Sequence, residues 1–131
     1  MCKNRHMTRR YLIVLALAGS ACGHPARGGA SLLPAGMGGV WQRESLHVIP
    51  PLNSGIARGF EAVYRGAGKL TVELYETKAP GTAFEMVQHW RAAPNTVVFD
   101  KGRYFVRVEW EQADRQALTA FVRALQKVLD E

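Results

Sequence analysis

The most apolar stretch of the chain, Tyr11 to Ala18, is eight residues long and directly follows Arg9 and Arg10. Three small residues, at positions 19–21, follow this stretch. A basic end, a short apolar segment and a small-residue exit are typical of a secretory signal peptide. The run is too short for a membrane span, which needs about 20 apolar residues, and it lacks the polar side of an amphipathic core helix. We therefore expect residues 1–21 to be removed on export, so that only the remainder of the chain builds the fold.

Cys22 stands immediately after the small residues, in the sequence AGSAC. This arrangement resembles the lipobox of bacterial lipoproteins, in which the cysteine becomes the first residue of the mature chain and carries lipid. The family pattern has an aliphatic residue, usually Leu, three positions before the cysteine, whereas this chain has Gly19. The resemblance implies a protein anchored to a membrane of the cell envelope through lipid on Cys22.

Ordinary signal peptidase is the alternative, because Gly19 and Ala21 also satisfy its small-x-small requirement. It would cut at the same bond and leave a soluble periplasmic or secreted protein. Met7 is a second candidate start, since the leader from Met7 onward is already complete. With either start Cys2 is lost, so the mature chain keeps Cys22 alone. A single cysteine excludes an internal disulfide and leaves lipidation or a bond between two chains.

The positive charge of the chain lies largely in the leader. The full sequence has 17 Lys and Arg against 11 Asp and Glu, and Lys3, Arg5, Arg9 and Arg10 precede the cleavage site, where there is no acid. The mature chain therefore has 13 basic against 11 acidic residues, a net charge of +2. No basic stripe remains, so nucleic acid is not an expected partner.

Residues 23–39, GHPARGGASLLPAGMGG, are rich in Gly, Ala and Pro, with Leu32, Leu33 and Met37 as the only large apolar groups. Such a segment buries too little surface to offset its conformational entropy. The sequence therefore predicts a flexible, lipid-anchored tether over residues 22–40. A single small domain over residues 41–131 would follow.

Alternation and helical spacing divide this domain into elements. Apolar residues alternate in 44–49, 60–65 and 69–76, and the last two segments are joined by Gly66-Ala67-Gly68, which favours a hairpin. Residues 80–90 have helical spacing, and a second hairpin is expected at 96–110 around Lys101-Gly102. Residues 113–129 carry an apolar stripe at i, i+3 and i+4, which predicts a terminal amphipathic helix.

The order strand, hairpin, helix, hairpin, helix predicts an α+β fold, an antiparallel sheet of four to five strands with two helices on one face. The stretch GFEAVYRGAGKLTVELYETKAPGTAFEMVQHW, from Gly59 to Trp90, also resembles exported bacterial domains of unknown function. It is made of packing residues, so the resemblance implies a fold and no activity.

Reactive constellations are scarce in the sequence. Glu85 and His89 lie four residues apart on the expected helix and could supply two ligands of a metal, but no CxxC, HExxH or histidine cluster completes a site. There is no GxSxG motif for a nucleophilic serine. We expect no catalytic residues, no cofactor and no metal.

Two function classes follow, a non-catalytic module that binds a protein or an envelope component, and a small envelope hydrolase or metal-dependent enzyme with a scattered site. The first is favoured because the second lacks a constellation. Strand alternation places Leu70, Val72 and Leu74 toward the helices, so the other face of the sheet is the candidate binding face. Its expected binding residues are Tyr75, Phe105, Arg103 and Arg107.

Overall fold

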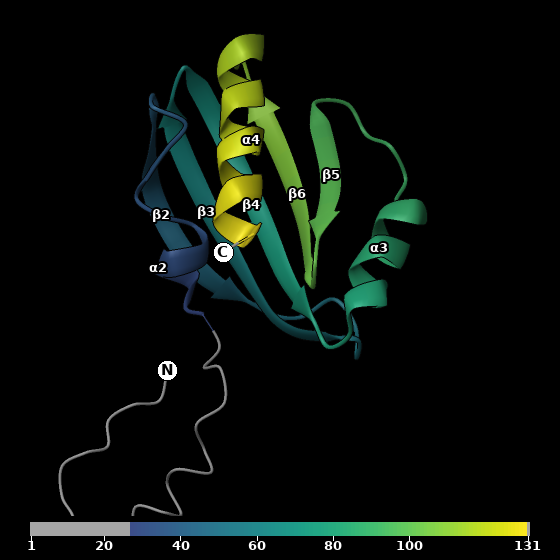
Figure 1. Cartoon of the computed structure of the whole chain (residues 1–131). Coiled ribbons are helices and arrows are strands. Elements are labelled where there is room, and N and C mark those ends of the chain that lie inside the picture. The colour runs from purple at the N-terminus through teal and green to yellow at the C-terminus, as the bar shows by residue number, and fades with distance from the viewer. Residues whose placement is uncertain (1–26, 131) are drawn as a thin grey trace, which may run out of the picture.

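A computed structural model describes residues 27–130, which form one antiparallel sheet and three helices (Figure 1). The strands pair in the order β1-β2-β3-β4-β6-β5. The α+β class is therefore as predicted, but the sheet has six strands. In chain order the elements are α2 (Gly29–Leu32), β1 (Gly36–Met37), β2 (Trp41–Ile49), β3 (Ile56–Gly66), β4 (Gly68–Thr77), α3 (Pro80–Gln88), β5 (Thr96–Lys101), β6 (Tyr104–Glu111) and α4 (Arg115–Asp130).

Both predicted hairpins are present. The β3–β4 hairpin keeps its register from Arg58 opposite Glu76 to Gly66 opposite Gly68. Gly68 has a φ of +126°, and a Cβ atom there would lie 2.7 Å from both the Ala113 Cα and the Gln112 carbonyl oxygen. A glycine is therefore required where the chain leading into α4 crosses this turn. The β5–β6 hairpin likewise turns at Gly102, whose φ is +59°.

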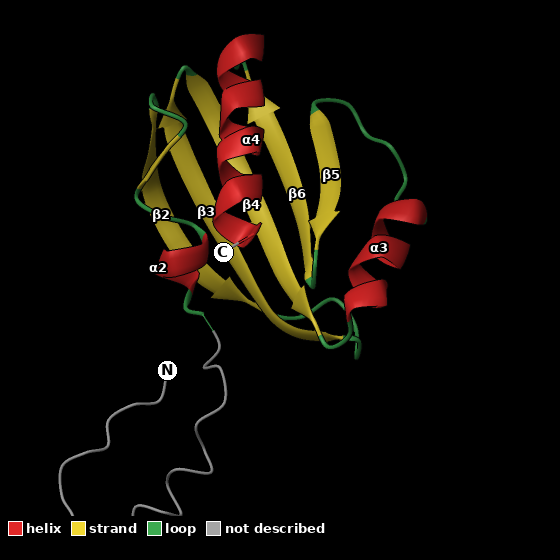
Figure 2. Ribbon diagram, in the orientation of Figure 1, coloured by secondary structure: helices red, strands yellow, loops and turns green. Residues whose placement is uncertain are grey.

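The terminal helix α4 covers one face of the sheet, as its apolar stripe predicts (Figure 2). It begins after Asp114, whose side chain accepts a hydrogen bond from the Ala117 backbone N–H at 2.9 Å. Phe121 lies at the centre of the contact, with edge-on rings of Tyr64 at 4.9 Å and Trp41 at 6.2 Å between centroids. The buried side chains that α4 contributes to this core are Phe121, Leu125 and Leu129.

The second long helix, α3, packs on the opposite face, so the expectation of two helices on one face is wrong. Residue Leu74 belongs to the core under α4, whereas its neighbour Tyr75 belongs to a second buried cluster with Phe105, Ile56 and Ala83 of α3. Successive strand residues point to opposite faces. The physical reason is the apolar patch that Tyr75, Phe105 and Ile56 form on the far side of the sheet. Helix α3 covers this patch, and only two residues separate it from the end of β4.

The predicted tether is also wrong within the described residues. Leu32 and Leu33 are fully buried and Met37 is 5% exposed, all three in the same core as Trp41 and Phe121. The segment is held by side chains of the sheet as well, since the Arg43 guanidinium donates to the Leu33 carbonyl at 2.6 Å and the Tyr64 hydroxyl to the Pro34 carbonyl at 2.7 Å. These contacts offset the conformational entropy that the segment loses on folding, a loss that its composition suggested would keep it unfolded. Residues 27–40 therefore belong to the folded domain, which does not begin at residue 41.

Candidate functional site

Two of the four residues expected on the candidate binding face are buried. Phe105 is fully buried and Tyr75 is 3% exposed, beneath α3 and the Trp90 that follows it. The rings of Trp90 and Phe105 lie 5.0 Å apart between centroids, and those of Tyr75 and Phe105 lie 6.3 Å apart. The cover over both rings is a helix of the same chain, so neither ring is free to contact a partner.

The two arginines of the predicted face lie in different surroundings. Arg103 is exposed in the β5–β6 turn, and its carbonyl accepts hydrogen bonds from the backbone N–H and the hydroxyl of Thr77, both at 2.8 Å. Arg107 is half-buried on β6, where its guanidinium pairs with Glu73 at 3.3 Å and Glu109 at 3.6 Å. The structure therefore does not bring the four predicted residues together as one accessible surface.

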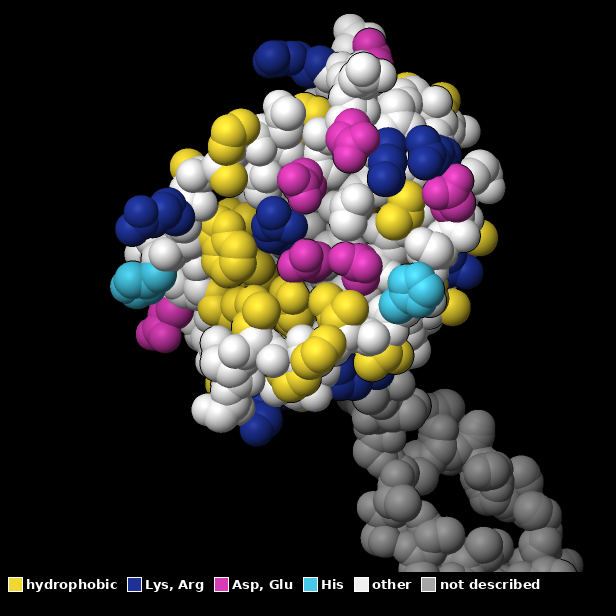
Figure 3. All heavy atoms as spheres, turned by 180° about the vertical axis from the view of Figure 1, so that it is seen from behind, with side chains coloured by type: hydrophobic (Ala, Val, Ile, Leu, Met, Phe, Trp, Pro, Cys, Tyr) yellow, Lys and Arg dark blue, Asp and Glu magenta, His cyan; other side chains and the backbone are white. Residues whose placement is uncertain are grey.

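The part of this face that α3 leaves uncovered carries a row of charged side chains. Strand register places His47 opposite Glu61, Glu61 opposite Glu73, and Glu73 opposite Arg107. Figure 3 views this face and shows acidic and basic groups gathered near its centre, beside an apolar area. The opposite charges of Glu73 and Arg107 stabilise the sheet by about 0.2 to 1 kcal/mol, whereas the like charges of Glu61 and Glu73 oppose each other.

Tyr75 connects the buried patch to this row, because its hydroxyl donates to the Glu73 carboxylate at 3.1 Å. Burial, assisted by the charge of Glu73 and by this hydrogen bond, raises the pKa of Tyr75 to about 12, although nearby Arg107 opposes the shift. The phenol is therefore a permanent donor at physiological pH and has no role as a base.

Glu85 lies in α3, and His89 directly follows the last residue of that helix. The imidazole Nδ1 of His89 lies 3.0 Å from the backbone carbonyl oxygen of Glu85, so the ring binds the end of its own helix. Among residues 27–130 no group of three or more His, Cys, Asp or Glu side chains is placed to hold a metal ion.

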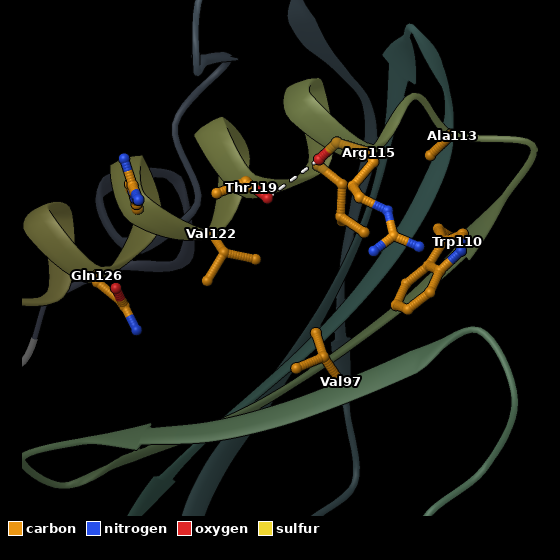
Figure 4. A pocket seen from close by; sticks show the side chains of 9 residues that line it. Val97, Trp110, Ala113, Arg115, Thr119, Val122 and Gln126 are labelled. Atoms are coloured by element: carbon orange, nitrogen blue, oxygen red, sulfur yellow. Dashed lines mark hydrogen bonds between the residues drawn. The ribbon is translucent and has the colours of Figure 1, made fainter.

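A groove lies between α4 and the β5–β6 hairpin (Figure 4). Its volume is about 580 Å³, within the range of small-molecule and side-chain binding sites. The groove exists because α4 lies over the middle of the sheet and leaves the apolar side chains toward the β5 edge half-covered. Its lining residues are Val97, Trp110, Ala113, Arg115, Leu118, Thr119, Val122, Arg123 and Gln126.

The groove combines an apolar interior with positive charge. Val97 and Trp110 approach from the sheet, and Val122 faces them from α4 (Figure 4). Arg115 and Arg123 are both exposed on α4, and neither makes an ion pair within the described part of the chain. No acidic side chain lines the groove. The groove therefore favours a group that has an apolar part and a negative charge.

The sequence alone does not reveal this groove, because alternation places Trp110 on the same strand face as Val106 and Val108. Those two valines are fully buried under α4, while Trp110 is only half-buried near the end of β6. The available signal was the pattern of α4, where Arg115 and Arg123 flank the apolar stripe at twice the helical i, i+4 spacing and so share one side of the helix.

Comparison with family models, curated proteins and solved structures finds no match to this chain. Among residues 27–130, no helix has both the length and the apolar character needed to cross a membrane. The predicted signal peptide and Cys22 lie outside the described residues.

Proposed function

We propose that the chain is an exported, lipid-anchored domain without catalytic activity that binds a protein or another component of the cell envelope, and that the groove beside α4 is its binding site. The observation that carries the binding site is the pairing of a half-covered apolar interior with Arg115 and Arg123, in a groove without an acid. The leader and the AGSAC sequence support export and anchoring.

The occupant that fits is an apolar chain or side chain next to a carboxylate or a phosphate. Apolar contact with Val97, Trp110 and Val122 would provide most of the free energy, because burial of apolar surface is the main favourable term in association. The two guanidinium groups would bind the anionic part, and their planar donors suit oxyanions. The charged row on the opposite face is less suited to this role because Arg107 is already paired there.

Octanoate and octanol provide a matched test, because they share an apolar chain and differ in the negative charge. We expect octanoate to shift the backbone amide resonances of Val97, Trp110 and Val122 in an NMR titration of the mature chain. Changing Arg115 and Arg123 to Gln should weaken octanoate about fivefold, since exposed ion pairs contribute up to about 1 kcal/mol, and should leave octanol unchanged.

Arg91→Gln is the control variant, because Arg91 is exposed and does not line the groove. It should bind octanoate as the unaltered chain does. Equal affinity for octanoate and octanol, or resonance shifts that fall outside the groove, would refute the proposed site.

A further inference from the structure

The connection between the anchor residue and the folded domain is short. Arg27 is already fixed to the domain, because its guanidinium donates to the Val128 carbonyl of α4 at 2.9 Å and its own carbonyl accepts from Arg58. Cys22 lies only five residues before Arg27. Covalent geometry limits five residues to about 17 Å even when fully extended.

The same end of the domain gathers four separate segments. The Lys78 N–H donates to the Gly55 carbonyl at 2.9 Å, and the Thr77 N–H donates to the Arg103 carbonyl at 2.8 Å. The Lys101 ammonium group lies 3.5 Å from the carboxylate of Asp130 at the end of α4. The β2–β3 loop, the β4–α3 connection, the β5–β6 turn and the end of α4 thus form one surface, as Figure 1 also shows. We call this surface the anchor end and define it by Arg27, residues 50–55, Lys78, residues 101–103 and residues 127–130.

Unpaired positive charge dominates the anchor end. Glu76 pairs with Arg58 and Asp130 pairs with Lys101, which leaves Asp100 as the one other acid of this region among the described residues. Four basic residues of the anchor end make no ion pair with a described residue; they are Arg27, Lys78, Arg103 and Lys127.

An exposed apolar loop accompanies these charges. Pro50, Pro51 and Leu52 are all exposed, and the Leu52 side chain is 50% accessible. Basic groups beside exposed apolar side chains are the composition that binds the headgroup region of an anionic bilayer, where each Lys or Arg is attracted by the surface potential.

We propose that the anchor end lies against the anionic surface of the membrane that holds the lipid on Cys22, so that the short connection fixes the orientation of the domain. The inference rests on the proposed lipid anchor. The helix α4 has 16 residues and is therefore about 24 Å long. This exceeds the reach of the connection, so the inverted orientation, with the β3–β4 turn against the bilayer and Arg27 farthest from it, is excluded.

Fluorescence quenching by lipid headgroups tests the orientation. The full chain is expressed, purified from membranes as the mature protein and reconstituted in vesicles of phosphatidylcholine with spin-labelled headgroups. A fluorophore is attached to Leu52→Cys at the anchor end or, as the control, to Gln116→Cys, an exposed position at the start of α4. We expect quenching at position 52 to exceed that at position 116 at least threefold.

Two variants separate the contributions of the short connection and of charge. An insertion of about 20 Gly and Ser residues between Ala26 and Arg27 raises the r.m.s. reach to about 27 Å and should abolish the difference between the two positions in neutral vesicles. Addition of phosphatidylglycerol should increase quenching at position 52. The double change Lys78→Glu and Arg103→Glu should remove that increase, whereas Arg65→Glu with Lys69→Glu at the β3–β4 turn should retain it.

The mass of the mature protein distinguishes the possible failures. An unmodified Cys22 refutes the anchor and, with it, this orientation. A lipidated chain with equal quenching at the two positions refutes the orientation and leaves the anchor intact. A lipidated chain whose response to phosphatidylglycerol survives the Lys78 and Arg103 changes refutes the anionic contact.

Discussion

Replacing Leu33 with alanine tests whether the segment before Trp41 is part of the core or a tether. Leu33 is fully buried in the core that contains Trp41 and Phe121. The change removes three carbon atoms, which costs about 2 to 2.5 kcal/mol in transfer free energy, and the cavity left behind brings the expected loss to about 3 to 4 kcal/mol. A domain of this size has a free energy of unfolding of about 5 to 15 kcal/mol in total. The variant should therefore lose about a fifth or more of its stability.

Urea unfolding of the mature chain, followed by tryptophan fluorescence, measures this loss. The midpoint should fall while the slope of the free energy with urea stays unchanged, because the surface exposed on unfolding is nearly the same. Leu52→Ala is the matched control, since the Leu52 side chain is half-exposed in a loop, and surface changes usually stay within about 0.5 kcal/mol. If Leu33→Ala is no more destabilising than Leu52→Ala, the segment does not dock and the sequence-based tether was right.

Three further outcomes are expected. Phe105→Ala should lower the free energy of unfolding by about 3 to 5 kcal/mol because the ring is buried under α3. A nearly native midpoint of thermal or urea unfolding would instead indicate that the ring is exposed and available to a partner. Since the pKa of Tyr75 is raised above that of an unfolded tyrosine, the folded state keeps its proton longer, so stability from this group is complete below pH 10 and is lost as the pH rises toward about 12. Tyr75→Phe should reduce the loss of unfolding free energy between pH 10 and about 12. An unchanged pH dependence of stability in this variant would contradict the raised pKa of Tyr75. Cys22→Ala should move the mature protein from membranes to the soluble exported fraction, and persistent membrane association on fractionation would argue against lipidation.

The elements that the sequence predicted well depend on local pattern. The β3–β4 hairpin follows from alternation on both sides of Gly66-Ala67-Gly68, and the stripe of α4 specifies which side of the helix is buried. Both patterns extend over a whole strand or helix, so the tertiary contacts of the folded domain agree with the local preference for that structure. The second hairpin was predicted for the same reason, at the correct turn.

The elements that the sequence missed depend on partners far along the chain. Leu32 and Leu33 are buried by Trp41 and α4, and no pattern within residues 23–39 contains those partners. The face that α3 occupies is likewise set by Tyr75 and Phe105, whose alternation places them opposite the main core. The sequence analysis assigned these rings to a binding face, because a strand that packs against a helix of the same chain has the same alternation as one that binds a partner protein.

The candidate site was missed for a related reason. A half-covered groove is a property of how far α4 extends over the sheet, and the helix length alone does not determine which strands it leaves exposed. Trp110 shares its face with Val106 and Val108, which are buried. Only the position of α4 determines that Trp110 is half-buried while Val106 and Val108 are fully buried.

The anchor and the groove together restrict where a partner can be. Arg115 of the groove lies 13 residues before Val128, the α4 residue that Arg27 contacts, and this separation is about 20 Å along the helix. In the proposed orientation, with at most about 17 Å of connection below the domain, the Arg115 end of the groove lies about 20 to 37 Å from the bilayer surface. A tether over residues 22–40 would have allowed the groove to sample a wider range of heights and orientations, whereas the proposed anchor limits it to this range on the aqueous side. A partner that binds there must therefore itself lie close to the membrane, or extend an apolar, acidic segment to within that distance.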